Sequence, residues 1–130
     1  MKVYISGCMT TDQGHYVEHF NSAEKVLKEK GYIITNPAAK EHFDRVVLSS
    51  KLEDPWSDSA WKDFIKYDID LVSEHDVIAL LSGWENSMGV YVELATAKRF
   101  GLNVVFEKDN FKSLISDWTI KDLKNIENNL

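Results

Sequence analysis

The segment 76–81, which reads DVIALL, constrains the fold of this chain more than any other stretch. After its first residue it is apolar at every position, so a strand formed here buries both of its faces. Such strands are typical of parallel sheets that helices cover on both sides. Short apolar runs at 2–6, 32–35 and 103–107 alternate with helical patterns at 16–30, 59–73 and 88–100. The pattern predicts an α/β domain, flavodoxin-like or Rossmann-like, with a parallel sheet of four to five strands.

Length and composition indicate a single domain over 1–130. The chain has 130 residues, of which 44% are hydrophobic, enough for a proper core. We expect a cytoplasmic protein, because no stretch approaches the ~20 apolar residues of a membrane span and nothing resembles a signal peptide. The single cysteine, Cys8, excludes an internal disulfide and fits a reducing compartment. The net charge of −6 argues against a nucleic-acid polymer as partner, but not against a small nucleotide.

Three loops follow the predicted strands at the sheet edge where such folds bind ligands. These loops are 7–14, 36–58 and 82–87. Trp84, beside Gly83 in the third loop, is our candidate for an aromatic side chain that lines the pocket. We expect no metal and no cofactor.

Asp68 occupies an unusual position in the predicted helix 59–73. Projected at 100° per residue, it falls within an apolar stripe, four residues after Phe64 and four before Val72. Burial of a lone carboxylate raises its pKa, and a carboxylic acid that stays protonated near neutral pH suits a general acid. The alternative is that the stripe reaches the surface here and that Asp68 caps a helix or pairs with another group.

Glu93 lies at the edge of the apolar stripe of the predicted helix 88–100. Gly89, one turn earlier on the same side, would leave space through which a ligand approaches. Asn86 or Ser87 is expected to cap the helix, whose N-terminus favours an ionised carboxylate. The alternative is an exposed glutamate on a helix flank.

Taken together, Asp68 and Glu93 predict an acid and a nucleophile whose pKa values are pushed apart. Cleavage of the N-glycosidic bond of a nucleoside requires this pair. One carboxylate attacks the anomeric carbon, and the other group protonates the leaving base.

At these residues the chain resembles the nucleoside 2-deoxyribosyltransferase superfamily, and within it a short phage and bacterial branch. The resemblance covers 2–107. It rests on the order and spacing of four pieces, namely VYISG, NPA, W…YDID…HDVIALL and GWENSMGVYVELATAKRFG. It implies that Glu93 is the nucleophile, that Asp68 manages the proton, and that Tyr4 hydrogen-bonds the nucleophile.

The resemblance also implies a substrate-binding set. Gly7 matches the glycine of a phosphate or sugar loop, and Ser87 makes the chain look more like the nucleoside 5′-monophosphate N-glycosidases. In those enzymes a serine from a neighbouring subunit completes the phosphate site. Ser113 is our candidate for that serine, which implies a homodimer or a higher homo-oligomer.

The loop after the first strand departs from the family pattern. It reads GCMTTDQGH, without the arginine of the monophosphate hydrolases, and Cys8 stands where the short branch usually has proline. A phosphate would therefore rely on Ser6, Thr10, Thr11 and backbone amides.

Three functions remain open from the sequence. The first is an N-glycosidase or deoxyribosyltransferase that acts on a nucleoside or, preferably, a 5′-mononucleotide. The second is a non-catalytic module that binds a nucleotide in the same cleft. The third is a TIR-type NAD glycohydrolase, whose spacing fits this chain less well.

Overall fold

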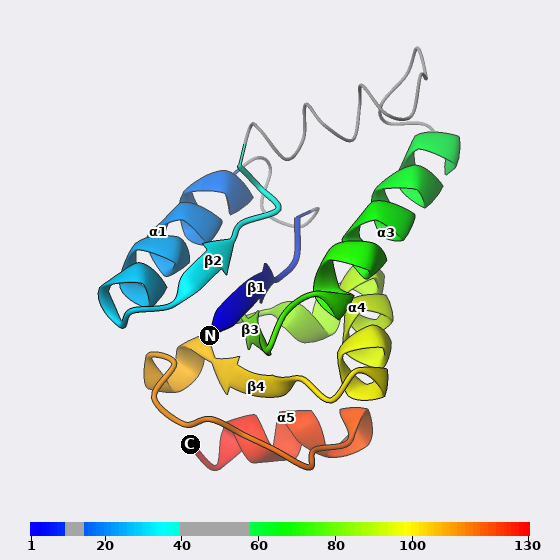
Figure 1. Ribbon diagram of the computed structural model, residues 1–130. Coiled ribbons are helices and arrows are strands. Elements are labelled where there is room, and N and C mark those ends of the chain that lie inside the picture. The colour runs from blue at the N-terminus through cyan, green and yellow to red at the C-terminus, as the bar shows by residue number, and fades with distance from the viewer. Residues whose placement is uncertain (10–14, 40–57) are drawn as a thin grey trace.

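A four-stranded parallel sheet forms the centre of the protein (Figure 1). The computed structural model describes residues 1–9, 15–39 and 58–130, without the side chains of 58–61, 63 and 64. The strands lie in the order β2-β1-β3-β4. Their bounds are Lys2–Ser6 for β1, Ile33–Thr35 for β2, Val77–Leu80 for β3 and Asn103–Phe106 for β4. The predicted parallel α/β fold is thus confirmed.

Helices cover both faces of this sheet (Figure 1). Their bounds are Tyr16–Glu29 for α1, Asp58–Ser73 for α3, Met88–Arg99 for α4 and Ile120–Asn128 for α5. Two 3₁₀ turns, η1 over Trp84–Asn86 and η2 over Glu107–Asp109, follow β3 and β4. Helix α1 lies on one face, and α3 and α4 lie side by side on the other. No helix in the described part of the chain is long and apolar enough to cross a membrane.

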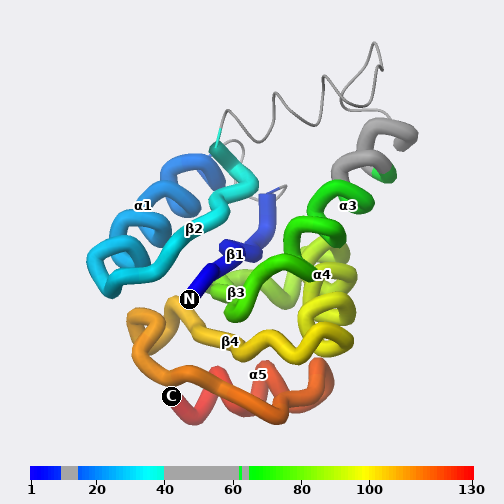
Figure 2. The backbone as a smooth tube through the Cα atoms, viewed as in Figure 1, coloured from blue at the N-terminus to red at the C-terminus, as the bar shows by residue number. Residues whose placement is uncertain are grey.

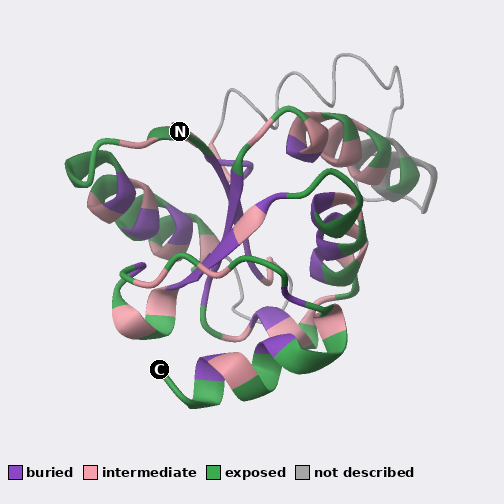
Figure 3. Cartoon of the chain, turned by 60° about the horizontal axis from the view of Figure 1, so that its bottom comes forward, coloured by how far each residue is buried: buried purple, intermediate pink, exposed green. Residues whose placement is uncertain are grey.

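The alternation of side chains along β1 divides the core into two clusters. Val3 and Ile5 pack with the α1 side chains Phe20, Ala23 and Leu27. Tyr4 belongs to the opposite cluster, which includes side chains of α4 and α5. In Figure 3 the strands β1, β3 and β4 are buried along most of their length, whereas the edge strand β2 is not, and the helices turn buried residues inward. Every even-numbered residue of β1 from Tyr4 onward therefore faces α3 and α4.

The helix of the tail after β4 begins later than the sequence predicts. We predict a helical tail from Phe111, but α5 begins only at Ile120. Asn110 and Phe111 have φ values of 59° and 58°, which interrupt any helix at that point. The chain then runs back beside β4 and forms an antiparallel bridge between Ile115 and Val104, as the tube in Figure 2 lets the reader follow. This bridge covers the outer edge of β4.

Gly7, directly after β1, lies against Leu81, directly after β3. A Cβ atom added at Gly7 would lie 3.0 Å from Leu81 Cβ and 3.2 Å from Leu81 Cγ. The Leu81 backbone N–H donates to the Ser6 carbonyl oxygen over 3.0 Å, so neither strand end can easily move away. A side chain at Gly7 would therefore collide with the core.

We expect Gly7→Ala to destabilise the fold by roughly 1–3 kcal/mol, the usual cost of overpacking. Gly89→Ala is the matched control, because its added Cβ meets only Ser87 Oγ at 3.6 Å and Ile65 Cδ1 at 3.7 Å, which are ordinary contacts. Alanine also favours the helix by up to about 1 kcal/mol. Urea denaturation measures both effects, and equal midpoints for Gly7→Ala and the wild type would contradict the packing argument.

Candidate functional site

The candidate site forms where β1, α3 and α4 meet. Helices α3 and α4 pack closely, and Ile65 of α3 faces the position of Gly89 on α4. One turn further along each helix come Asp68 and Glu93, so the two carboxyl groups approach each other. Strand β1 runs beneath this helix pair, and its even-numbered residues face it. The tertiary structure thus brings together the two carboxyl groups that the sequence separates by 25 positions.

Two hydroxyl groups of β1 hold the Glu93 carboxyl group. The Tyr4 hydroxyl donates to Glu93 Oε2 over 2.6 Å. The Ser6 hydroxyl donates to Glu93 Oε1 over 2.7 Å. Tyr4 is 0%, Ser6 1% and Glu93 7% exposed, so both contacts lie away from water. The prediction that Tyr4 contacts Glu93 is confirmed. Ser6 also contacts Glu93, a contact that was not expected, and its phosphate-binding role stays a prediction.

The protonation state of Glu93 differs from the expectation. Burial, and after it the negative charge of Asp68, raise the pKa of Glu93 from its ordinary value to about 8. The hydrogen bonds from Tyr4 and Ser6 oppose this shift but do not cancel it. Glu93 is therefore protonated at neutral pH in the free protein, and the prediction of an ionised Glu93 is wrong. Glu93 lies beyond the first turn of α4, where the helix dipole has little effect. The helix N-terminus therefore does not offset the effect of burial on the Glu93 pKa.

Asp68 is half-buried rather than enclosed within an apolar stripe. The negative charge of Asp68 contributes to the raised pKa of Glu93. Its charge and its hydrogen bond with Tyr4 also contribute to the raised pKa of Tyr4. Burial is the largest cause of the Tyr4 shift, followed by the charge of Glu93. The Tyr4 pKa lies well above its usual value of 10.0, so the phenol stays neutral.

His75, between α3 and β3, supports the Tyr4 ring and was missed in the sequence. The two rings meet edge to face, with centroids 5.6 Å apart. His75 Nδ1 lies 2.5 Å from the Leu71 carbonyl oxygen, and Nε2 lies 2.7 Å from Thr35 Oγ1. Burial lowers the pKa of His75, so Nδ1 donates to the carbonyl while neutral Nε2 accepts from Thr35. The local sequence carries no signal for this role, because Thr35 and Tyr4 belong to other strands.

Ser87 and Gly89 lie at the N-terminus of α4, the helix that carries Glu93. The predicted cap is confirmed, because Ser87 Oγ accepts from the Val90 backbone N–H over 3.4 Å. The space beside Gly89 can take a methyl group without a clash. Gly89 is therefore not required by packing in the free protein, which leaves its predicted role in ligand access open. Gly7, in contrast, has a steric reason of its own against Leu81.

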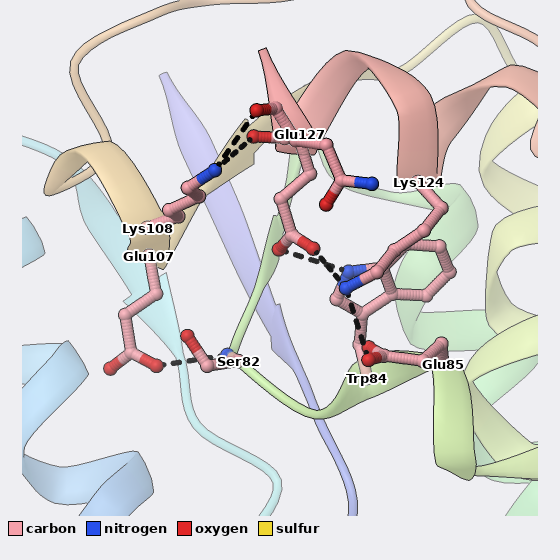
Figure 4. A network of polar contacts seen from close by, with 8 residues as sticks. Ser82, Trp84, Glu85, Glu107, Lys108, Lys124 and Glu127 are labelled. Atoms are coloured by element: carbon pink, nitrogen blue, oxygen red, sulfur yellow. Dashed lines mark hydrogen bonds and ion pairs between the residues drawn. The ribbon is translucent and has the colours of Figure 1, made fainter. Parts of the chain in front are cut away.

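Trp84 does not line an open pocket, and that prediction is wrong. It is 1% exposed and packs in the core cluster of α4 and α5. Its indole N–H donates to Glu127 Oε2 over 3.2 Å, as Figure 4 shows. Lys124 bridges the carboxylates of Glu127 and Glu85, at 2.8 and 3.0 Å. These contacts hold the loop between β3 and α4 against α5.

Glu127 is a buried carboxylate that the sequence analysis missed, although a signal was present. It follows Ile120 by seven residues and Leu123 by four, which places it on the apolar stripe of α5. The helical projection that selects Asp68 also selects Glu127. Its partners Trp84 and Lys124 give it a structural role.

Two kinds of predicted site residue remain. Thr10 and Thr11 fall outside the described residues. Ser113 follows β4, and β3 lies between β4 and β1 in the sheet. The Ser113 backbone N–H donates to the Asp109 side chain. Its role in a neighbouring subunit stays a prediction. Within the described ranges, no three His, Cys, Asp or Glu side chains gather as a metal site requires.

The raised pKa of Glu93 predicts how stability depends on pH. The folded-state pKa of about 8 exceeds the ordinary value of 4.5, so the folded protein binds this proton more tightly than the unfolded chain. The resulting stabilisation is fully present below the ordinary pKa and is lost as pH rises through the folded-state pKa. Relative to Glu93→Gln, the wild type should lose up to a few kcal/mol across this window, since one pKa unit is about 1.4 kcal/mol.

Urea denaturation at a series of pH values measures this loss. The exposed Glu18 provides the matched control, because Glu18→Gln should follow the wild-type curve. Parallel curves for the wild type and Glu93→Gln would show that the Glu93 pKa is not raised.

The comparisons with known proteins give a family but no activity. No curated protein matches the chain. Residues 1–106 match the model of a family described as a domain of unknown function, DUF4406. The match therefore includes β1, α3 and α4, with Tyr4, Ser6, Asp68 and Glu93. Because this match spans most of its length, the chain belongs to the DUF4406 family.

Proposed function

We propose that the protein is an N-glycosidase that cleaves the base–sugar bond of a nucleoside 5′-monophosphate, or transfers its deoxyribosyl group. The observation that carries this proposal is the Glu93 carboxyl group, held by the Tyr4 and Ser6 hydroxyls beside a second carboxyl group, Asp68. An acid and a nucleophile at one site are what N-glycosidic cleavage needs. The resemblance to the deoxyribosyltransferase superfamily assigns the same two residues.

The proposed reaction has two steps. An oxygen of ionised Glu93 bonds to C1′ while the C1′–N bond breaks, and the electron pair leaves with the base. Asp68 gives a proton to the base nitrogen. Water then attacks C1′, the bond between the Glu93 oxygen and C1′ breaks, and the water proton passes to the Asp68 carboxylate. A second base in place of water gives transfer, and both routes retain the configuration at C1′.

The preference for a 5′-monophosphate rests on Ser87. This residue caps α4, a helix of 12 residues, and the N–H groups of a helix N-terminus favour an anion. The resemblance places a phosphate near the corresponding serine in the monophosphate N-glycosidases. It also implies that Ser113 of a second copy completes the phosphate site, which analytical ultracentrifugation would test through the mass of the assembly.

Base release is the direct test of this proposal. The purified protein is incubated with ribo- and deoxyribonucleosides and with their 5′-monophosphates, and free base is followed by chromatography. We expect release from at least one monophosphate and none above background from Glu93→Gln. Asp68→Asn should lower the rate by roughly 10²–10⁴-fold, the usual contribution of a general acid.

Glu127→Gln is the matched control for Glu93→Gln. Both glutamates are buried, at 4% and 7% exposure, but Glu127 contacts Trp84 and Lys124 instead of the carboxyl pair. This control should release base at close to the wild-type rate. Full activity in Glu93→Gln would rule out the glutamate as nucleophile.

A second candidate function is a non-catalytic module that binds a nucleotide. The observation in its favour is the raised pKa of Glu93, because a carboxyl group protonated at neutral pH is no nucleophile. In that case one nucleotide raises the melting temperature, and mass spectrometry recovers it unchanged after prolonged incubation. Release of base from the same nucleotide would eliminate this candidate.

Gly89→Ala tests whether a substrate passes beside Gly89. The added methyl group would occupy space next to Ser87 and Ile65, which the free protein leaves unfilled. We expect a KM several times higher, measured by base release at varied substrate concentration, at a melting temperature no lower than that of the wild type. An unchanged KM would remove Gly89 from the binding site and leave the carboxyl pair unaffected.

A further inference from the structure

We propose that the Tyr4 hydroxyl is a proton bridge between Glu93 and Asp68, which converts the resting site into the reactive one. The inference rests on the proposed function for its use in catalysis, but the bridge itself exists or fails without any substrate. It answers a difficulty in the site, namely that the nucleophile holds a proton in the free protein while the general acid needs one.

The position of Tyr4 suits a bridge. Its hydroxyl lies 2.6 Å from Glu93 Oε2, and it also engages Asp68 through a side-chain hydrogen bond. Strand β1 therefore presents one hydroxyl to a carboxyl group on each of the two neighbouring helices. Tyr4 is fully buried, so its oxygen offers the proton a route between the carboxyl groups that does not pass through bulk water.

The transfer balances without an outside proton donor. When Glu93 is ionised, the Tyr4 hydroxyl donates to Glu93 Oε2. While Glu93 holds its proton, this bond is reversed, so that the proton on Oε2 donates to the Tyr4 oxygen and the Tyr4 hydroxyl donates to the Asp68 carboxylate. The Glu93 proton moves to Tyr4 as the Tyr4 proton moves to Asp68. Afterwards Glu93 is ionised, Asp68 is protonated, and Tyr4 is again a neutral phenol that donates to Glu93.

Neighbouring charges are consistent with a bridge that stays neutral. Burial and the two carboxyl groups raise the pKa of Tyr4, so the phenol never has to exist as a phenolate. His75 meets the Tyr4 ring at its edge, and burial lowers the pKa of His75, so it adds no charge at neutral pH. A substrate that placed positive charge development at C1′ would draw the negative charge onto Glu93 and so complete the transfer.

Ser6 provides the matched comparison. Its hydroxyl donates to Oε1, the other oxygen of Glu93, over 2.7 Å, and it is as deeply buried as Tyr4. Ser6→Ala and Tyr4→Phe each remove one hydroxyl donor to Glu93. Only Tyr4→Phe removes the oxygen that also reaches Asp68.

Proton NMR of the ligand-free protein tests the bridge whether or not the protein is an enzyme. We expect one low-field hydroxyl resonance that Tyr4→Phe abolishes, that Asp68→Asn and Glu93→Gln both shift, and that Ser6→Ala retains. A Tyr4 resonance unmoved by Asp68→Asn would overturn the proposal, as would the absence of any resonance that Tyr4→Phe removes. These outcomes do not depend on base release, so failure of the proposed function is recognised separately.

The pH profile of base release then tests the bridge in turnover. We expect Tyr4→Phe to lower kcat by roughly 10²–10⁴-fold with little change in KM, and to shift the remaining activity to higher pH, where solvent removes the Glu93 proton. Ser6→Ala should cost no more than about tenfold, the value of one neutral hydrogen bond, and keep the wild-type profile shape. Equal losses and identical profiles for the two variants would reduce Tyr4 to a simple hydrogen-bond donor and overturn the relay.

Discussion

The parallel pairing of β1 with β3 is the constraint on which the core and the candidate site both depend. Val3 lies opposite Val77 and Ser6 opposite Leu80, so β1 is fixed at the centre of the sheet. This register sends Tyr4 and Ser6 toward α3 and α4 while their neighbours pack on α1. A slip by one residue would turn both hydroxyls to the other face, and Glu93 would lose both of its hydrogen bonds.

Burial then determines the chemistry of the carboxyl pair. A carboxylate removed from water is strongly disfavoured, and two hydroxyl donors offset only part of that penalty. Glu93 therefore holds a proton, and the nearby charge of Asp68 makes the proton harder to remove. In the proposed mechanism, the location of the proton between the two carboxyl groups decides whether the site is resting or reactive.

The segment after β4 supports the site from outside the family-matched residues 1–106. It covers the edge of β4 through the bridge at Ile115. Its Glu127 and Lys124 hold Trp84 and Glu85 in the loop that leads to α4 (Figure 4). The helix that carries Glu93 is thus anchored at its start by a part of the chain to which the family description does not extend.

The sequence by itself determined the alternation of strands and helices, the parallel sheet, and the two carboxylates at apolar positions, because hydrophobic periodicity is a local property. It also placed the bounds of α3 and α4 within a residue or two. Only the tertiary structure decided that Ser6 contacts Glu93, that Trp84 enters the core, and that the α-helix of the tail begins only at Ile120. The same holds for the protonation of Glu93, since a pKa depends on burial and on charges from distant segments, which no local pattern contains.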